Sequence, residues 1–254
     1  MRSPFPAEIA FAFRERTAGD EGALAAALTP QERELLTPGA SPKRVAEFAL
    51  GRATARAALR ELGAWPEGTP PPPILRQARA PVWPPGVVGS LAHSRGAALA
   101  AAAWAPEPQG GRSRDRQAQG SQSQGRQVRG RRLNGIGADL ERLDRDTSSI
   151  APRVLRPEER AALAGRAPGL VTLLFCVKEC IYKALHPLTG EYLGFQDARV
   201  LAPEPLPDLT QAGAGTLTWE LLKACGADYP AGLRGAAGWC LAPPWLAAGV
   251  WIEA

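Results

Sequence analysis

Long apolar runs and paired cysteines are scarce in this sequence of 254 residues. The four cysteines do not form two Cys-X-X-Cys pairs, which argues against a structural zinc site. The apolar run Ala97–Ala105 is about half as long as a helix that spans a bilayer. Arg14, Glu15 and Arg16 interrupt the only early apolar run, so no signal peptide is expected. These absences predict a soluble, cytoplasmic protein.

The positive charge of the chain is confined to one segment. The net charge is +5, but residues 109–132 hold seven arginines and a single aspartate, so the rest of the chain is slightly acidic. This segment is rich in Gln, Ser and Gly and is too polar to form a core, which predicts a disordered insertion between two strands. An RNA-binding arm is the alternative, although no aromatic residues alternate with the arginines for base stacking.

The remainder of the chain repeats itself at an offset of 127 residues. Leu28–Leu36 and Leu155–Leu163 have similar sequences, and both read as helix starts with proline in the first turn. Thr29 and Glu32 have the spacing of a capping box. The same offset places a helix predicted over 42–62 on one predicted over 170–185. The pattern predicts a duplicated strand–helix–helix unit.

Two carboxylates lie close together on a predicted strand. Residues 136–141 alternate, so Asp139 and Glu141 share the face opposite Ile136, Ala138 and Leu140. Like charges placed side by side would repel each other. A hard divalent cation would remove this repulsion, and a third carboxylate from another element would complete the site.

A predicted helix supplies the third carboxylate. Glu179 and Lys183 are four residues apart and therefore share a helix face. The apolar stripe of this helix consists of Leu170, Leu174, Val177, Ile181 and Leu185. For an isolated pair, a surface ion pair worth about 0.3–0.5 kcal/mol is the simpler interpretation. The acidic strand upstream makes a functional site competitive with it.

The first half carries bases on the matching helix, which Ser41-Pro42 begins and Gly63 ends. Its basic side chains are Lys43, Arg44, Arg52 and Arg56. A solvated basic face is one interpretation, and a phosphate-binding face opposite the carboxylates is the other. His93 borders a buried strand predicted at 96–104. Ser90 and Ser94 flank it, and Arg76 and Arg79 lie nearby in sequence, which favours a functional role for this histidine.

Trp-rich candidate strands near 216–222, 236–241 and 247–252 complete an α+β protein. Four segments together resemble the 4'-phosphopantetheinyl transferase superfamily, in its large pseudo-dimeric type and in the subgroup of enterobactin synthetase component D. These segments are residues 47–52, 83–93, 136–141 and 175–184. The resemblance implies two pseudo-symmetric α/β lobes with the active site in the cleft between them. The expected parts are an N-terminal lobe (1–108), the insertion (109–132) and a C-terminal lobe (133–254).

The resemblance also implies a reaction of the holo-[acyl-carrier-protein] synthase type. The phosphopantetheine arm of coenzyme A would move to a serine of an apo acyl or peptidyl carrier protein, releasing adenosine 3',5'-bisphosphate. Mg²⁺ would lie on Asp139, Glu141 and Glu179. Glu179 and Lys183 would be catalytic, with Glu179 helping to deprotonate the serine directly or through water. Coenzyme A would contact Arg44, Arg52, Arg76, Arg79, Ala92, His93, Asp139, Lys183 and Leu193.

Two positions depart from the pattern of the family. Ala92 stands where relatives often carry Ser or Thr, which removes a possible contact to coenzyme A, and Ala138 stands where Ile is common. Two other functions stay open: another Mg²⁺-dependent nucleotide phosphohydrolase, or an RNA-binding module that acts through the insertion. The carrier could serve fatty-acid, polyketide or nonribosomal peptide synthesis, so secondary metabolism is one expected setting. The internal duplication favours a monomer.

Overall fold

The computed structural model describes residues 1–77, 80–107, 132–166, 169–201 and 206–254. The predicted insertion lies outside the described residues except for Arg132. The first half contains β1 (Ala10–Glu15), α1 (Glu21–Ala26), α2 (Pro30–Arg33), α3 (Pro42–Leu62), β2 (Leu75–Gln77), β3 (Ala80–Val82), β4 (Val87–Ser94) and β5 (Ala97–Trp104). The second half contains β6 (Leu133–Arg142), α4 (Ala151–Val154), α5 (Pro157–Ala162), α6 (Gly169–Thr189), β7 (Ala198–Leu201), β8 (Gly213–Leu221), β9 (Arg234–Ala242) and β10 (Trp245–Glu253).

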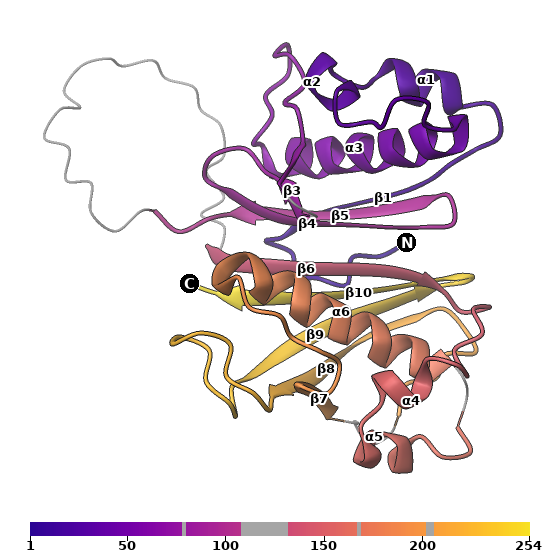
Figure 1. Ribbon diagram of the computed structural model, residues 1–254, viewed down its shortest axis with the longest axis vertical. Helices are drawn as coiled ribbons and strands as arrows, with labels where there is room; N and C mark the ends of the chain where they lie inside the picture. Colours follow the sequence, from indigo (N-terminus) through magenta and orange to yellow (C-terminus); the bar gives the residue numbers. More distant parts are fainter. Residues whose placement is uncertain (78–79, 108–131, 167–168, 202–205) are drawn as a thin grey trace, which may run out of the picture.

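The two halves build antiparallel sheets with related strand orders, β1-β5-β4 and β6-β10-β9-β8-β7. In each sheet the first strand of the half pairs with the last, and the strand before the last lies beyond it. Helix α3 covers the outer face of the first sheet, and α6 packs on the second (Figure 1). The fold is therefore α+β, as predicted, and its topology agrees with the predicted duplication.

Alternation along the strands divides the core into layers. In β5, Leu99, Ala101 and Ala103 face the second sheet, whereas Ala100 and Ala102 pack beneath α3. The layer between the sheets also receives apolar side chains from β6 and β10, together with Phe5 from the N-terminal segment. At the edges of the two sheets β4 lies beside β6. The duplicated halves are thus joined by a shared apolar layer.

Both long helices begin, end and pack for reasons visible in the sequence. Ser41 caps α3 by accepting a hydrogen bond from the Arg44 N–H, and Gly63 ends it with a left-handed φ of 78°. The predicted apolar stripe of α6 is buried throughout. This helix continues to Thr189, with Pro187 in its last turn, and so is longer than the helix predicted over 170–185.

A buried glutamate secures each half. In the first half the carboxylate of Glu32 accepts hydrogen bonds from the Thr29 and Ile74 N–H groups, both at 2.9 Å, and from Arg56. Thr29 in turn accepts a hydrogen bond from the Glu32 N–H, which confirms the predicted capping box. One side chain therefore connects α2, α3 and the segment before β2.

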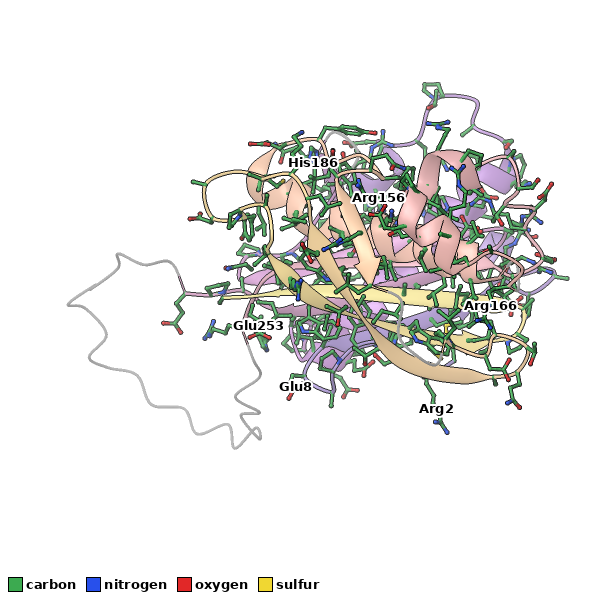
Figure 2. The ribbon with its side chains drawn as sticks, turned by 90° about the horizontal axis from the view of Figure 1, so that it is seen from below. Arg2, Glu8, Arg156, Arg166, His186 and Glu253 are labelled. Carbon is green, nitrogen blue, oxygen red and sulfur yellow. The ribbon has the colours of Figure 1, made fainter. Side chains whose placement is uncertain are left out.

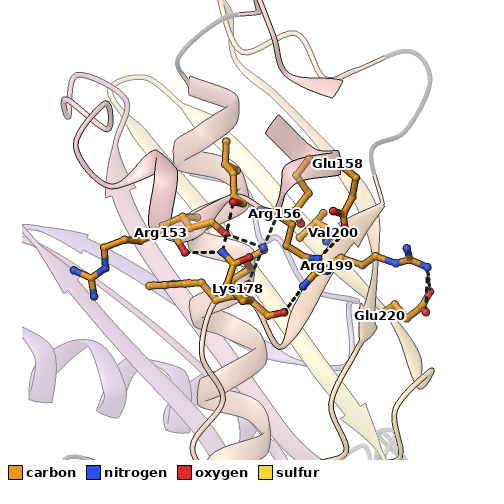
Figure 3. Close-up of polar contacts among 12 residues, drawn as sticks. Arg153, Arg156, Glu158, Lys178, Arg199, Val200 and Glu220 are labelled. Carbon is orange, nitrogen blue, oxygen red and sulfur yellow. Dashed lines mark hydrogen bonds and ion pairs between the residues drawn. The ribbon is translucent and has the colours of Figure 1, made fainter. Parts of the chain in front are cut away.

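Glu159 does the same in the second half, 127 positions later. It accepts hydrogen bonds from the Arg156 and Val200 N–H groups at 2.8 Å and from the Lys178 ammonium at 2.7 Å (Figure 3). Burial lowers the pKa of Lys178, and attraction to Glu159 opposes that shift. Because the two glutamates have matching backbone partners, the duplication extends to individual hydrogen bonds.

None of the described helices combines the length and the apolar character needed to cross a membrane.

Candidate active site

Strand β6 and helix α6 bring together the acidic residues predicted from the sequence. Asp139 and Glu141 lie on β6, whose Cα trace runs alongside α6. Lys183 of α6 donates hydrogen bonds to Asp139 Oδ1 at 2.6 Å and to the Ala138 carbonyl oxygen at 3.0 Å. The predicted helix face of Glu179 and Lys183 is therefore turned toward the acidic strand.

The close approach of α6 to β6 depends on a glycine. A Cβ placed on Gly137 would lie 1.8 Å from the carbonyl oxygen of Cys180. Only a residue without a side chain therefore allows the helix backbone to rest on the strand at this point. The contact lies two residues before Asp139, so it sets the distance over which Lys183 reaches the carboxylate.

Asp139 is buried and incompletely hydrogen-bonded. Only 8% of the residue is exposed, and its Oδ2 atom is buried without a hydrogen-bond partner. The nearby thiol of Cys176 is a weak donor, and its pKa is raised by burial and then by the charge of Asp139. A buried carboxylate oxygen without a strong donor is costly unless a cation or a donor is supplied.

The carboxylates influence one another electrostatically. Burial, followed by the charges of Asp139 and Glu141, raises the pKa of Glu179. Burial and Asp139 also raise the pKa of Glu141, against the attraction of Arg145. Burial acts to lower the pKa of Lys183, but its attraction to Asp139 and Glu179 raises it overall. At neutral pH Lys183 therefore remains charged, beside carboxylates that each disfavour the ionisation of the others.

Glu141 is held by two partners that the sequence interpretation did not include. Arg145 Nη1 donates to Glu141 Oε1 at 2.5 Å, and Ser94 Oγ of β4 donates to Glu141 Oε2 at 3.2 Å. The Arg145 contact could have been predicted from the sequence, because an arginine four residues after a glutamate is a candidate ion-pair partner. The Ser94 contact joins residues 47 positions apart and could not be read from local spacing.

The predicted trio shares one region of the structure but is not arranged as a set of metal ligands. Among the described residues, no group of three His, Cys, Asp or Glu side chains is placed so that it could hold a metal ion. Even so, the donors present suit a divalent cation. Asp139 Oδ2 has no hydrogen-bond partner, and the pKa of Glu179 is raised by burial and then by repulsion from Asp139 and Glu141, which a cation would relieve.

Basic side chains from the first half lie near one another. Arg52 is 5% exposed, stacks its guanidinium over the Phe48 ring at 4.2 Å, and has an Nε atom without a hydrogen-bond partner. Burial lowers the pKa of Arg52 to about 10, with further lowering from Arg76, Arg56 and Arg44 and an opposing effect from Glu32. Arg44 and Arg76 are exposed on α3 and β2. A polyanion is the natural counter-charge for such a group.

His93 connects the basic and acidic groups. The residue is exposed at the surface, yet burial by the surrounding protein and then Arg44 lower its pKa; Lys183 and Arg52 lower it further, and Glu47 opposes the shift. The histidine therefore lies close enough to sense both Arg44 of the first half and Lys183 of the second. The other histidine, His186, stacks on Tyr182 with ring centroids 4.9 Å apart and lies on the opposite side from Arg2 and Glu8 in Figure 2.

The remaining predicted contacts divide into three cases. Arg79 lies outside the described residues. Ala92 and Leu193 are buried, at 4% and 6% exposure, and offer little surface to a ligand in this state. Arg56, which the helix pattern placed on the phosphate-binding face, is instead buried against Glu32. That expectation is corrected, because Glu32 is 24 residues away and its approach could not be foreseen from helical spacing.

The fold is α+β, with one antiparallel sheet in each half and related strand orders. The carboxylates of the site lie in the second half, and the arginines lie in the first half. Residues 31–103 match the family described as the 4'-phosphopantetheinyl transferase N-terminal domain. Residues 135–233 match the 4'-phosphopantetheinyl transferase superfamily. The chain belongs to the 4'-phosphopantetheinyl transferase superfamily.

Individual relatives agree with this assignment. The chain is 38% identical over 192 residues to 4'-phosphopantetheinyl transferase Svp of Streptomyces mobaraensis, covering 72% of this chain and 61% of that protein. It is 35% identical over 196 residues to 4'-phosphopantetheinyl transferase Npt of Nocardia iowensis, covering 76% and 74%. It is 30% identical over 150 residues to enterobactin synthase component D of Salmonella typhi, covering 57% and 50%. The matched region thus spans less than two thirds of the first and third of these relatives.

Proposed function

We propose that the protein transfers the 4'-phosphopantetheine arm of coenzyme A to a serine of an apo carrier protein and releases adenosine 3',5'-bisphosphate. One observation carries the proposal beyond family membership. The carboxylates of β6 and α6 and the arginines of α3 and β2 come from different halves, and β4, which carries His93, lies against the acidic strand, where Ser94 donates a hydrogen bond to Glu141 at 3.2 Å. A diphosphate ester between these groups would meet positive charge on one side and a metal-binding face on the other.

The arginines suit the phosphates of coenzyme A. Arg52 keeps its charge at neutral pH, since its pKa of about 10 is well above 7, and its buried guanidinium adds positive charge beneath the exposed arginines. Arg44 and Arg76 add exposed cations nearby. Arg79 lies outside the described residues and remains a predicted member of this set. These side chains would fix the nucleotide end and so position the pyrophosphate for attack.

The carboxylates suit one Mg²⁺ ion. Asp139 would offer Oδ2, which has no hydrogen-bond partner because Lys183 occupies only Oδ1, and Glu179 would offer its carboxylate, while Glu141 stands beside them as the third acidic group. When bound, the ion supplies charge neutralisation on the pyrophosphate. Magnesium usually takes one or two protein carboxylates and fills its other positions with water and phosphate oxygens.

Glu179 and Lys183 have properties that match the catalytic roles. Glu179 shares with Lys183 the face of α6 that is turned toward β6, where its carboxylate would accept a proton from the serine hydroxyl, directly or through a water molecule. Lys183 stays protonated beside Asp139 and can balance negative charge that develops on the leaving phosphate. In-line attack by the serine oxygen on the β-phosphorus would break the bond to the bridging oxygen, which departs with the adenosine bisphosphate.

The loop after α6 is the proposed border of the pantetheine arm. Leu193 packs inward, whereas Tyr192 is 73% exposed and meets Tyr182 edge-on with centroids 5.8 Å apart. An apolar, partly open loop of this kind suits an arm with little charge. A monomer in the cytoplasm, acting on acyl or peptidyl carrier domains, remains the prediction from the sequence.

Intact-mass spectrometry of an apo carrier protein tests the proposed function. Incubation with the protein, coenzyme A and Mg²⁺ should add the mass of one phosphopantetheine to the carrier, and a carrier whose acceptor serine is replaced by alanine should not change. Consumption of coenzyme A at the same rate without a carrier would instead indicate hydrolysis and contradict the proposal.

A further inference from the structure

Strand β4 presents different side chains to the two halves of the molecule. Because side chains alternate along a strand, Leu91 and His93 share one face of β4. Ser90 and Ala92 share the other face. Leu91 packs with the core beneath α3, whereas Ala92 belongs to the apolar layer between the two sheets. The strand that carries His93 on its α3 side therefore holds Ser90 on the side of the second sheet.

The hydroxyl of Ser90 lies in apolar surroundings. Only 5% of the residue is exposed, and its neighbour on β5 is Ala101. A buried hydroxyl is costly unless it is hydrogen-bonded. Ser90 Oγ accepts a hydrogen bond from the Ala138 N–H at 2.9 Å, although the two residues are 48 positions apart in sequence. This hydrogen bond gives the buried serine a partner in the other half of the molecule.

The N–H of Ala138 needs a partner of this kind. Strand β6 is the outermost strand of its sheet, so alternate N–H groups along it point away from β10, its neighbour in that sheet. Ala138 is fully buried, and an unpaired buried N–H costs about as much as a lost hydrogen bond. Ser90 thus supplies, from the first half, a hydrogen bond that β6 does not make within its own sheet.

The same residue of β6 is also held from α6. The Ala138 carbonyl oxygen accepts a hydrogen bond from Lys183 at 3.0 Å, and this ammonium also donates to Asp139 Oδ1 at 2.6 Å. Ser90 of the first half and Lys183 of the second therefore bind the N–H and the carbonyl oxygen of one residue, directly before Asp139. A shift of the backbone at this point would disturb both contacts of Lys183.

Resting on the proposed function, we propose that Ser90 is a positioning residue that fixes the backbone before Asp139 and so keeps Lys183 aligned with the arginines of the first half. Ser90 acts through the backbone of β6 and not by touching the reacting atoms. It lies on the same strand as His93, three residues before it, so the strand beside the basic group also sets the position of the acidic strand. Because misplacing a reacting group by about 1 Å can lower a rate about 100-fold, the effect should appear in kcat.

Steady-state kinetics of carrier modification at saturating Mg²⁺ separate this role from a purely structural one. At a temperature where the variant is folded, Ser90→Ala should lower kcat at least about tenfold through misplacement of the reacting groups. The KM for coenzyme A should stay within about threefold, because the basic side chains are unchanged. Ser90→Thr keeps the hydroxyl and should restore most of the lost kcat. A wild-type kcat in Ser90→Ala would overturn the proposal.

Thr54→Val is the matched control. Thr54 is fully buried in α3, and its hydroxyl donates to the Leu50 carbonyl oxygen at 2.8 Å. This variant also loses a buried hydrogen bond, but one that does not involve β6, so it should lose stability and keep the wild-type kcat. If the control loses as much kcat as Ser90→Ala, the effect is one of general stability and the proposal is overturned.

Hydrogen exchange at the Ala138 amide, followed by nuclear magnetic resonance, tests the contact without relying on activity. In Ser90→Ala this amide loses its acceptor and should exchange at least about tenfold faster, while the amides that bind β10 keep their rates. Ser90→Cys keeps the size of the side chain but is a weaker acceptor, so it serves where Ser90→Ala does not fold. It should show faster exchange at Ala138 and a lower kcat than the wild type. Unchanged exchange at Ala138 in the folded variant would overturn the proposal.

Failure of the proposed function and failure of this role give different results. A wild-type protein that does not modify a carrier contradicts the proposed function, and exchange at the Ala138 amide then still tests the contact with Ser90. A wild-type protein that modifies a carrier, together with a wild-type kcat in Ser90→Ala, contradicts only the role of Ser90.

Discussion

Single side chains in the candidate site differ in how their charges are balanced. Lys183 is paired with Asp139 and Arg145 with Glu141, whereas Glu179 receives only long-range attraction from these cations. A partly buried carboxylate without an ion-pair partner is costly for stability when it is ionised. Raised pKa values of this kind are frequent among groups that exchange protons in active sites. The carboxylate assigned the proton transfer is thus the one of the three that has no ion-pair partner among the described residues.

Replacing Glu179 with glutamine should abolish transfer without harming the fold. We expect the rate to fall by at least about 100-fold, since a general base contributes roughly this much or more. Because the pKa of Glu179 is raised in the folded state, its ionised form destabilises the protein once pH exceeds the pKa of the unfolded chain. The free energy of unfolding of the variant at pH 7 should therefore be equal or higher. Urea unfolding would establish that the Glu179→Gln variant is folded. Full activity in that folded variant would refute the assigned role.

His93 should make the binding of coenzyme A depend on pH. Its pKa in the free protein is below the ordinary value of 6.5, and a bound polyphosphate would raise it. Affinity should therefore increase as pH falls through the pKa of the complex, and level off below the pKa of the free protein. Calorimetric titration should show a smaller pH dependence for His93→Gln than for the wild type. The difference between the proteins is decisive, because the ligand phosphate titrates in both; identical pH profiles would remove His93 from the binding set.

At the scale of secondary structure, helices and strands were predictable because their signals are local. The cap at Ser41, the stop at Gly63, and the alternation around Asp139 each depend on neighbours in sequence, and the structure agrees with all three. Burial of Arg56 by Glu32 and the contact of Ser94 with Glu141 were not predictable. Each of these joins segments that only the folded chain brings together.

The contact of α6 with β6 gives a prediction for an element as a whole. Gly137→Ala places a methyl group against the Cys180 carbonyl oxygen, so helix and strand must separate. We expect a loss of about 1–3 kcal/mol in the free energy of unfolding, as for other overpacked sites, together with reduced transfer as Glu179 and Lys183 shift. Gly22→Ala in α1 is the control, because no atom lies within 4 Å of its added methyl group. Denaturant unfolding that shows equal stability for Gly137→Ala and the wild type would contradict the close packing.

At the scale of the whole molecule, the family and the α+β fold followed from the sequence because four separated motifs carried them. The division of charge between the halves was also visible, since the acidic strand and the basic helix occupy matching positions in the repeat. The sequence placed Asp139, Glu141 and Glu179 together as equal ligands. In the structure the three carboxylates have different partners. Glu141 contacts both Ser94 of β4 and Arg145 of the turn after β6, and only the folded chain brings these two segments to the same side chain.

The insertion is predicted to be dispensable for transfer. Arg132 donates a hydrogen bond to the Ala105 carbonyl oxygen at 2.7 Å, so the described residues on either side of the insertion already meet. Replacing residues 108–131 with a short Gly/Ser linker should therefore leave the rate of carrier modification within about twofold, because loop length affects folding energy only weakly. Loss of carrier modification in a variant that still melts cooperatively would favour a functional role for the insertion.

The most direct test of the central claim is a crystal structure of the protein with coenzyme A and Mn²⁺, using the anomalous signal of manganese to locate the ion. The account predicts one manganese ion at Asp139 and Glu179, with the 3'-phosphate of the same coenzyme A molecule at Arg44, Arg52 and Arg76. Manganese located away from β6, or a nucleotide that does not contact the arginines of α3, would contradict it.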